Sequence, residues 1–268
     1  MRRLLSFTCE GAALGATLDD APGATGLLVV TGGTQTRIGS HRLFERLTLA
    51  LREAGHPCLR FDRRGVGDSE GNDPDWRGTG PDLAAAAAAF RRECPQVRQI
   101  VGFGLCDGAS ALAFQGAAAG LDAIILVNPW FVEAEAGAPP PAAIKDHYRR
   151  RLLSLAGWKR LLSGAVSVPK LIAGLRRIAS PGPGTLAGEI AQALDRSNLP
   201  LQLILASRDA TAVAAGAEWG AAAFSAVRAR SPEPVTIDSD SHTFSRPGDQ
   251  QALEDAVKAA LARRSGGG

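Results

Sequence analysis

The 268-residue sequence lacks the features that would place the protein in a membrane, on nucleic acid or around a structural metal. No stretch reaches about 18 uninterrupted apolar residues, so we expect no transmembrane helix. The net charge of +3 is too small to argue for nucleic acid as a partner. None of the four cysteines forms a CxxC pair or has histidines at metal-ligand spacing. We therefore expect no metal site, and no motif calls for a cofactor.

The cysteines and the N-terminus also bear on the compartment. Four scattered cysteines in a chain of this length are typical of reduced thiols. The arginine-led N-terminus has a short apolar run interrupted by Cys9 and Glu10, which is poor for a signal peptide. We expect a cytoplasmic, globular protein, with a disordered tail at 265–268.

What the sequence does contain is a regular alternation of apolar strand-like runs with helix-like segments. The expected strands are 25–33, 56–65, 99–105, 121–130, 199–209 and 233–239, and the clearest helices are 40–55, 81–94, 107–119 and 249–264. The early stretch 4–20 suits an antiparallel hairpin at the sheet edge. Continuous apolar strands alternating with helices predict an α/β fold whose mostly parallel sheet is covered on both faces.

One segment, 131–190, interrupts this alternation and separates a core made of 1–130 and 191–264. It opens with a proline-rich linker and continues with amphipathic helical patterns, so we expect a helical cap. Between Ala142 and Ile178 it holds nine Lys or Arg and one acid. This basic stripe is either a solvated face or a contact for an anionic lipid, acyl carrier or polysaccharide, which leaves peripheral membrane contact open.

The stretch "GFGLCDGAS" (102–110) has the form of a nucleophile elbow, with Cys106 where most such turns have serine. Its glycines allow a sharp strand-to-helix turn that exposes the central side chain. The following helix points its N-terminus at that side chain, which favours a thiolate. The alternative is an inert buried cysteine.

Further along the chain, two more residues supply the acid and the base that follow the nucleophile in the order found in hydrolases. Asp209 and His242 each follow a predicted strand. His242 would take the thiol proton, and Asp209 would orient the imidazole. Asp238 and Asp240 are rival acids, but they lie close to His242 in sequence.

Two glycine-rich stretches fit the same plan. The backbone N–H of Asp107, together with that of Gly33 or Thr34, would form an oxyanion hole. Arg37 and His41, in the stretch "TQTRIGSHR", are candidate substrate contacts, although His41 would equally cap the next helix. The loop "FDRRGVGDSEG" (61–71) is expected to have an architectural role.

On these motifs the chain resembles an α/β-hydrolase over nearly its whole length. More narrowly, "GGTQTRIGSHRLF", "LRFDRRGVGDSEG" and "GLCDGASAL" together resemble the hydrolase 1 family of the exosortase A system. That resemblance implies acyl-group chemistry near exopolysaccharide production. Dienelactone hydrolase is a precedent for a Cys-His-Asp triad on this fold.

Two functions follow from these observations. The first is an enzyme, an esterase, thioesterase or acyltransferase, that hydrolyses or transfers an acyl group through an acyl-cysteine. Its substrate would be a small ester or thioester, free or linked to a carrier or polysaccharide. The second is a hydrolase-like fold that binds a ligand or partner without catalysis.

Overall fold

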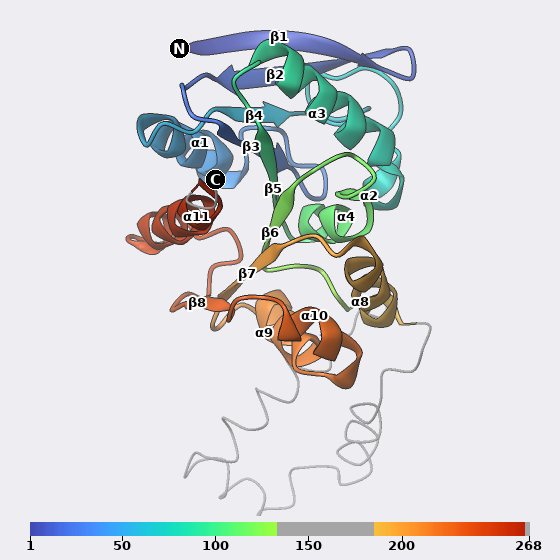
Figure 1. Ribbon diagram of the computed structural model, residues 1–268, viewed down its shortest axis with the longest axis vertical. Helices are drawn as coiled ribbons and strands as arrows, with labels where there is room; N and C mark the ends of the chain where they lie inside the picture. Colours follow the sequence, from blue (N-terminus) through green and yellow to red (C-terminus); the bar gives the residue numbers. More distant parts are fainter. Residues whose placement is uncertain (133–184, 266–268) are drawn as a thin grey trace, which may run out of the picture.

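The computed structural model describes residues 1–132 and 185–265, and a single sheet organises them (Figure 1). Eight strands lie in the order β1-β2-β4-β3-β5-β6-β7-β8. They are β1 (Arg2–Cys9), β2 (Ala12–Asp19), β3 (Thr25–Val30), β4 (Cys58–Phe61), β5 (Gln99–Leu105), β6 (Ala123–Val127), β7 (Leu201–Ala206) and β8 (Val235–Ile237). Strand β1 pairs antiparallel with β2, and β2 with β4, whereas every pairing from β4 to β8 is parallel. The edge hairpin and the parallel sheet predicted from the sequence are confirmed.

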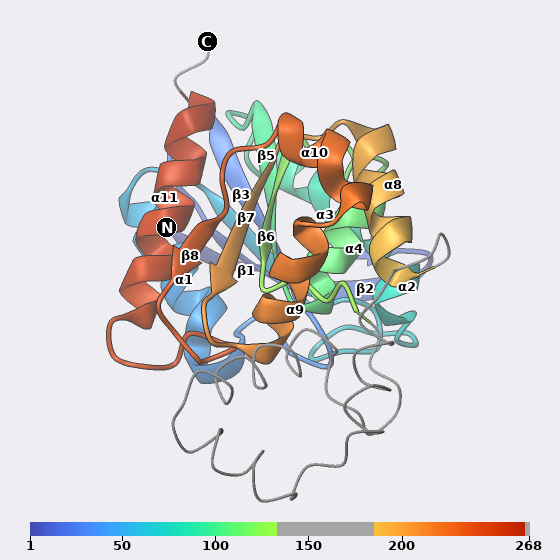
Figure 2. The same cartoon turned by 90° about the horizontal axis from the view of Figure 1, so that it is seen from below.

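Helices cover both faces of this sheet, with α1 and α11 on one side and α3, α4 and α8 on the other (Figure 2). The helices are α1 (Leu43–Glu53), α2 (Asp75–Gly78), α3 (Gly80–Glu93), α4 (Asp107–Gln115), α8 (Leu186–Ser197), α9 (Ala210–Trp219), α10 (Ser225–Ala229) and α11 (Asp249–Ser265), with short 3-10 turns η1 (Ser40–Arg42) and η2 (Ala222–Phe224). Within the described residues no helix is both long and apolar enough to cross a membrane.

The double cover explains why the central strands are apolar without interruption. Along β6, Ile124 and Leu126 pack into the core beneath α3, α4 and α8, whereas Ile125 and Val127 pack into the core beneath α1 and α11. Successive strand residues point to opposite faces, so a strand buried on both faces needs apolar residues at every position.

The two ends of the predicted cap are part of the hydrophobic core that packs on the sheet. The interior of the predicted cap, 133–184, and its basic stripe lie outside the described residues. Phe131 is buried and stacks on Phe224, with ring centroids 5.3 Å apart. Helix α8 begins at Leu186, and Leu186 and Ile190 are buried in the core. The predicted boundary at 190 is therefore too late, because the apolar face of α8 is needed to cover the sheet. At the C-terminus, helix α11 extends to Ser265, which is the first residue of the tail expected to be disordered.

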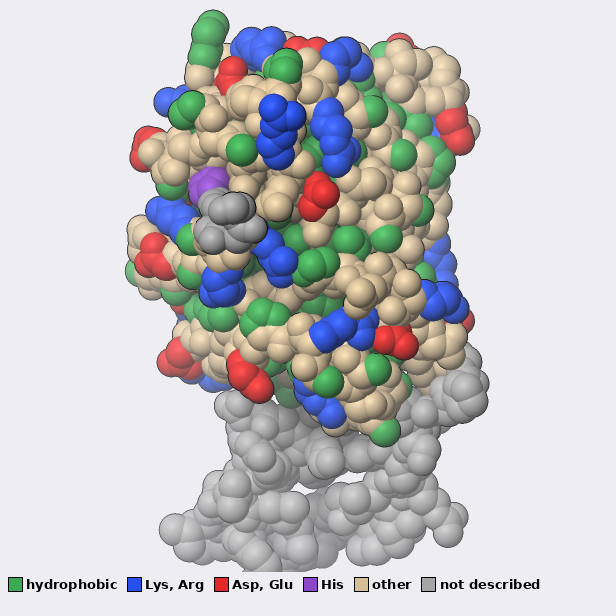
Figure 3. Space-filling view, viewed as in Figure 1, with side chains coloured by type: hydrophobic (Ala, Val, Ile, Leu, Met, Phe, Trp, Pro, Cys, Tyr) green, Lys and Arg blue, Asp and Glu red, His purple; other side chains and the backbone are tan. Residues whose placement is uncertain are grey.

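Acidic and basic side chains are interspersed on the face of the molecule that Figure 3 presents. They are not segregated by sign there, which agrees with the small net charge.

Candidate active site

Cys106 occupies a strained turn between β5 and α4. Its φ of 60° and ψ of −126° are unusual for a residue with a side chain, and such a conformation costs on the order of 1–3 kcal/mol. Glycines on either side make the turn possible. A Cβ at Gly104 would lie 2.5 Å from the carbonyl oxygen of Gly108, and one at Gly108 would lie 2.6 Å from the carbonyl oxygen of Val30. The predicted elbow is present, and the thiol stands at the N-terminus of α4, half-buried.

His242 and Asp209 come together at the same edge of the sheet. His242 Nδ1 lies 3.0 Å from Asp209 Oδ1. Asp209 is the N-cap of α9, and the same oxygen accepts the N–H of Ala212 at 2.9 Å. The hydrogen bond from Ala212 therefore holds the carboxylate in position. Because this carboxylate accepts a hydrogen bond from Nδ1–H of His242, it favours the tautomer with the proton on Nδ1.

Cys106 is the second hydrogen-bonding partner of the imidazole. Burial lowers the pKa of His242, but the hydrogen bonds to Asp209 and Cys106 outweigh it and raise the pKa to about 10. The imidazole thus interacts with both the Asp209 carboxylate and the Cys106 thiol.

The two rival acids are committed elsewhere. Asp238 accepts hydrogen bonds from Ser207, at 3.1 Å, and from Arg208. Asp240 forms an ion pair with Arg246 at 2.7 Å. Neither carboxylate is the partner of the imidazole, whereas Asp209 contacts it.

Asn128 is part of this site, and the sequence analysis missed it. It follows β6 with a φ of 41° and is fully buried. Its Nδ2 donates to the carbonyl oxygen of His242 at 2.9 Å, and its Oδ1 accepts the N–H of Ala206 at 2.8 Å. The asparagine before Pro129, directly after an apolar strand, is the only local signal for this role.

The oxyanion-hole candidates separate into engaged and unengaged N–H groups. The N–H of Gly33 lies 2.8 Å from both carboxylate oxygens of Asp107. In contrast, the N–H groups of Thr34 and Asp107 have no hydrogen-bond acceptor among the described residues. The sequence offered the N–H of Gly33 or that of Thr34 as the second donor beside the N–H of Asp107. In the structure the N–H of Thr34 is the one that remains available.

Arg37 differs from its expected role as a contact for a substrate anion. Its guanidinium pairs with Asp62 and, at 2.7 Å, with Asp68, and it donates to Thr17 at 3.2 Å. Ser69 closes the same loop by donating to the carbonyl oxygen of Asp62 at 2.6 Å. These partners use the donors of Arg37 inside the protein and confirm the architectural role expected for the loop at 61–71.

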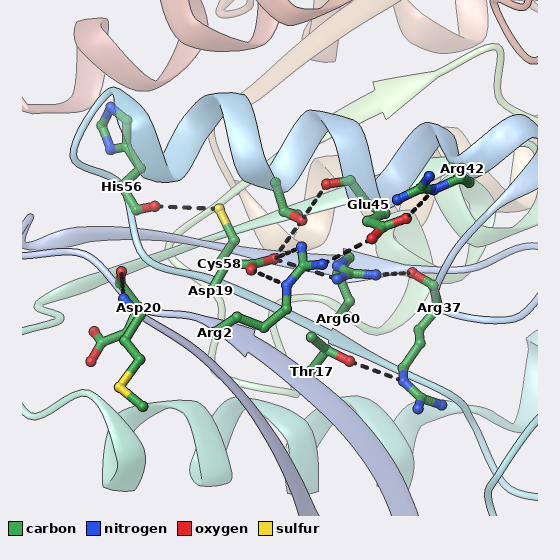
Figure 4. Close-up of polar contacts among 12 residues, drawn as sticks. Arg2, Thr17, Asp19, Asp20, Arg37, Arg42, Glu45, His56, Cys58 and Arg60 are labelled. Carbon is green, nitrogen blue, oxygen red and sulfur yellow. Dashed lines mark hydrogen bonds and ion pairs between the residues drawn. The ribbon is translucent and has the colours of Figure 1, made fainter.

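A buried ionic network supports the loop at 31–42 from behind (Figure 4). Arg60, 2% exposed, donates to the carbonyl oxygen of Arg37 at 2.8 Å and pairs with Asp19 at 3.4 Å. Burial raises the pKa of the Asp19 carboxyl, but bonds from Arg2, Thr48 and the charge of Arg60 lower it below its usual value. Removing one member of such a buried pair costs about 3–5 kcal/mol, so this loop has a rigid base.

Metal chemistry has no candidate ligand set in residues 1–132 and 185–265. No group of three or more His, Cys, Asp or Glu side chains there is arranged to hold an ion.

Comparison with known proteins agrees with the fold. The sequence matches the model of the Alpha/beta hydrolase family over residues 27–259. The chain therefore belongs to that family, which confirms the predicted fold and the expectation of a hydrolase. No curated protein sequence matches the chain.

Solved structures give the same fold at low sequence identity. An esterase from Pyrococcus furiosus aligns with a TM-score of 0.67 and 17% identity, covering 99% of this chain and 92% of the esterase. An esterase from Butyrivibrio proteoclasticus with bound ferulic acid aligns with a TM-score of 0.63 and 20% identity, covering 97% and 98% of the two chains. A dienelactone hydrolase from Anabaena variabilis has a TM-score of 0.63 and 15% identity, with coverage of 97% and 95%.

Proposed function

We propose that the protein breaks an ester or thioester by passing the acyl group through Cys106. The observation that carries this proposal is the imidazole of His242, held between the Asp209 carboxylate and the Cys106 thiol. A thiol at a strained elbow, a base beside it and a carboxylate behind the base are the parts that nucleophilic acyl chemistry requires.

The first half of the reaction forms the acyl-enzyme. His242 accepts the thiol proton, and its raised pKa favours the resulting imidazolium. The sulfur then attacks the carbonyl carbon, and the carbonyl π electrons move to oxygen. The N–H groups of Asp107 and Thr34 stabilise that oxyanion. When the oxyanion collapses, the bond to the leaving oxygen or sulfur breaks, and His242 returns its proton to the leaving group.

The second half releases the acyl group. Water, or an amine or thiol acceptor, loses a proton to His242 and attacks the thioester carbon. Collapse of the second oxyanion expels the Cys106 sulfur, which regains its proton from His242. The motif resemblance to the exosortase-associated hydrolase 1 family extends this proposal to a cytoplasmic acyl ester or thioester linked to exopolysaccharide production.

The test is turnover of p-nitrophenyl acetate together with intact-protein mass spectrometry. The expected result is an acetyl adduct on the wild type that Cys106→Ala lacks, and a loss of about 10²–10⁴-fold in the acylation rate of His242→Ala. A further variant, Asp209→Asn, removes the carboxylate beside the imidazole. Asp238→Asn is its matched control, because it alters a rival acid that does not contact the imidazole. Full activity of Cys106→Ala would remove the thiol from the reaction.

A binding protein without catalysis is the second candidate, and the contact between Asp107 and Gly33 favours it. In that contact the carboxylate occupies an N–H expected of an oxyanion hole. Asp107→Ala frees that N–H without touching the triad. If the wild type lacks turnover and adduct, catalysis by the native protein is contradicted, and acylation by Asp107→Ala alone would show that the carboxylate blocks the site. Acylation of the wild type supports the enzyme.

A further inference from the structure

A polar pocket adjoins the loop that bears His242. It has a volume of about 280 Å³ and lies between the start of α1 and the loop that precedes α11. The residues that matter for its chemistry are His41, Arg46, Thr243, Phe244, Arg246 and Gln250. Thr243 and Phe244 directly follow His242 in sequence, so the pocket begins next to the residue that bears the imidazole.

The charges around this pocket have one sign. Arg46 and Arg246 line it, and none of the described residues that line it is acidic. Arg246 has a carboxylate partner in Asp240. Arg46 is different, because it donates only to the neutral Oε1 of Gln250, at 3.3 Å, and has no carboxylate partner among the described residues. Its positive charge is thus available to a ligand.

The backbone holds the walls of the pocket in conformations that residues with side chains rarely adopt. His41 and Phe244 each have a φ of 53°. Phe244 is also 1% exposed, which anchors that wall in the core. Conformations of this kind persist where the surrounding structure enforces them.

The position of the pocket selects one half of the substrate. In the reaction proposed above, His242 must reach the leaving atom to protonate it. The acyl carbon is bonded to Cys106 at that moment, so the leaving group lies on the imidazole side. An arginine without a carboxylate partner there recognises an oxyanion through charge-assisted hydrogen bonds.

We infer that this pocket binds a carboxylate or phosphate carried by the leaving group of the substrate. The inference rests on the proposed function, because it names the substrate class of the same site. Anionic thioesters and esters are then preferred over neutral ones of the same size. Arg46 is the principal specificity residue, and His41 lines the same pocket.

The test compares thioesters that differ only in charge. S-acetyl-3-mercaptopropionate carries a carboxylate, its methyl ester is neutral, and S-acetyl-2-mercaptoethyl phosphate carries a phosphate on the same spacer. The loss of thioester absorbance gives kcat/KM for each substrate. Each kcat/KM is divided by the rate at which hydroxylamine cleaves the same thioester, which corrects for differences in intrinsic reactivity. We expect the wild type to favour an anionic thioester about 10- to 100-fold over the neutral one. The larger of the two anionic preferences identifies carboxylate or phosphate.

The variant Arg46→Gln removes the charge at an exposed position and should reduce this preference to near one. Arg52→Gln, on the same helix but outside the pocket, is the matched control and should keep the preference. Equal kcat/KM for anionic and neutral substrates, or a preference that survives in Arg46→Gln, would overturn the inference.

A second measurement separates the pocket from the reaction. 3-(Methylthio)propionate should slow the alkylation of Cys106 by iodoacetamide, whereas its methyl ester should not, and Arg46→Gln should abolish the protection. Charge-dependent protection without any turnover would support the pocket and contradict the proposed function. Turnover without charge preference or protection would do the reverse.

Discussion

The side-chain amide of Asn128 donates to the backbone carbonyl of His242, and the two atoms lie 2.9 Å apart. The same side chain accepts the N–H of Ala206 at the end of β7. One buried asparagine therefore joins the end of β6, the end of β7 and the loop that carries the imidazole. It holds His242 by the backbone, while Asp209 holds it by the ring.

We predict that Asn128→Ala destabilises the fold by about 2–4 kcal/mol, because it leaves a buried N–H and a buried carbonyl without partners. Urea unfolding gives this free energy. We also expect kcat to fall more than KM rises, since the imidazole loses its backbone support. Asn198→Ala is the control, because Asn198 also has a positive φ but is exposed, and its cost is about 1 kcal/mol. Equal costs for the two variants would show that backbone strain, not the two hydrogen bonds, accounts for the effect.

The raised pKa of His242 predicts how stability depends on pH. A histidine whose pKa rises from 6.5 to about 10 on folding stabilises the fold fully below pH 6.5. That contribution declines as the pH increases towards 10. Asp209→Asn removes the carboxylate charge that helps to raise the pKa, so its destabilisation should be largest near pH 6 and smaller near pH 10. Chemical denaturation of both proteins across this range measures the difference. A destabilisation that grows with pH would contradict the assignment of this pair.

How far the site follows from the sequence depends on the range of each interaction. Cys106 was predictable because the elbow is local, and its glycines are adjacent in the chain. Asp209 and His242 were predictable because parallel strands bring their C-terminal ends to one edge. The same topology predicted the edge hairpin and the two-sided cover.

The remaining features depend on contacts between distant segments. The carboxylate of Asp107 meets Gly33 across 74 positions of sequence, and nothing local distinguishes that N–H from that of Thr34. Arg37 has the composition of an anion contact, but Asp62 and Asp68 approach it only in the folded protein. The end of the cap was misplaced because a helix that covers a sheet and one that covers a site are both amphipathic.

The four thiols should differ sharply in reactivity. Cys9, Cys58 and Cys94 are buried, whereas Cys106 is half-buried at a helix N-terminus. Burial raises the pKa of the Cys58 and Cys9 thiols and is the main cause that raises the pKa of Cys94 to about 12. We predict that iodoacetamide alkylates Cys106 at least about tenfold faster than the others, as peptide mapping would show.

His242→Ala tests the origin of this selectivity. Without the imidazole, Cys106 has no partner to take its proton, and its alkylation should slow while the other three thiols are unchanged. Loss of selectivity through faster labelling of Cys9, Cys58 or Cys94 would instead report local unfolding. Unchanged labelling of Cys106 would mean that the histidine does not activate it.

A thiol in place of serine predicts a preference for acyl transfer over hydrolysis. A serine would store the acyl group as an oxygen ester, whereas Cys106 stores it as a thioester. Thioesters react readily with amines and thiols, and their advantage towards water is smaller. The thiol also needs less help from its base than a hydroxyl does.

We predict that the wild type hydrolyses p-nitrophenyl esters slowly after a burst, and that an added amine or thiol accelerates the steady state. Stopped-flow detection of p-nitrophenolate, with mass spectrometry of the adduct, measures both phases. Cys106→Ser is the matched control, since it keeps the elbow but forms an oxygen ester that the acceptor should not discharge. Fast hydrolysis by the wild type, with no accumulated adduct and no effect of acceptor, would identify an ordinary esterase in which the nucleophile alone has been replaced.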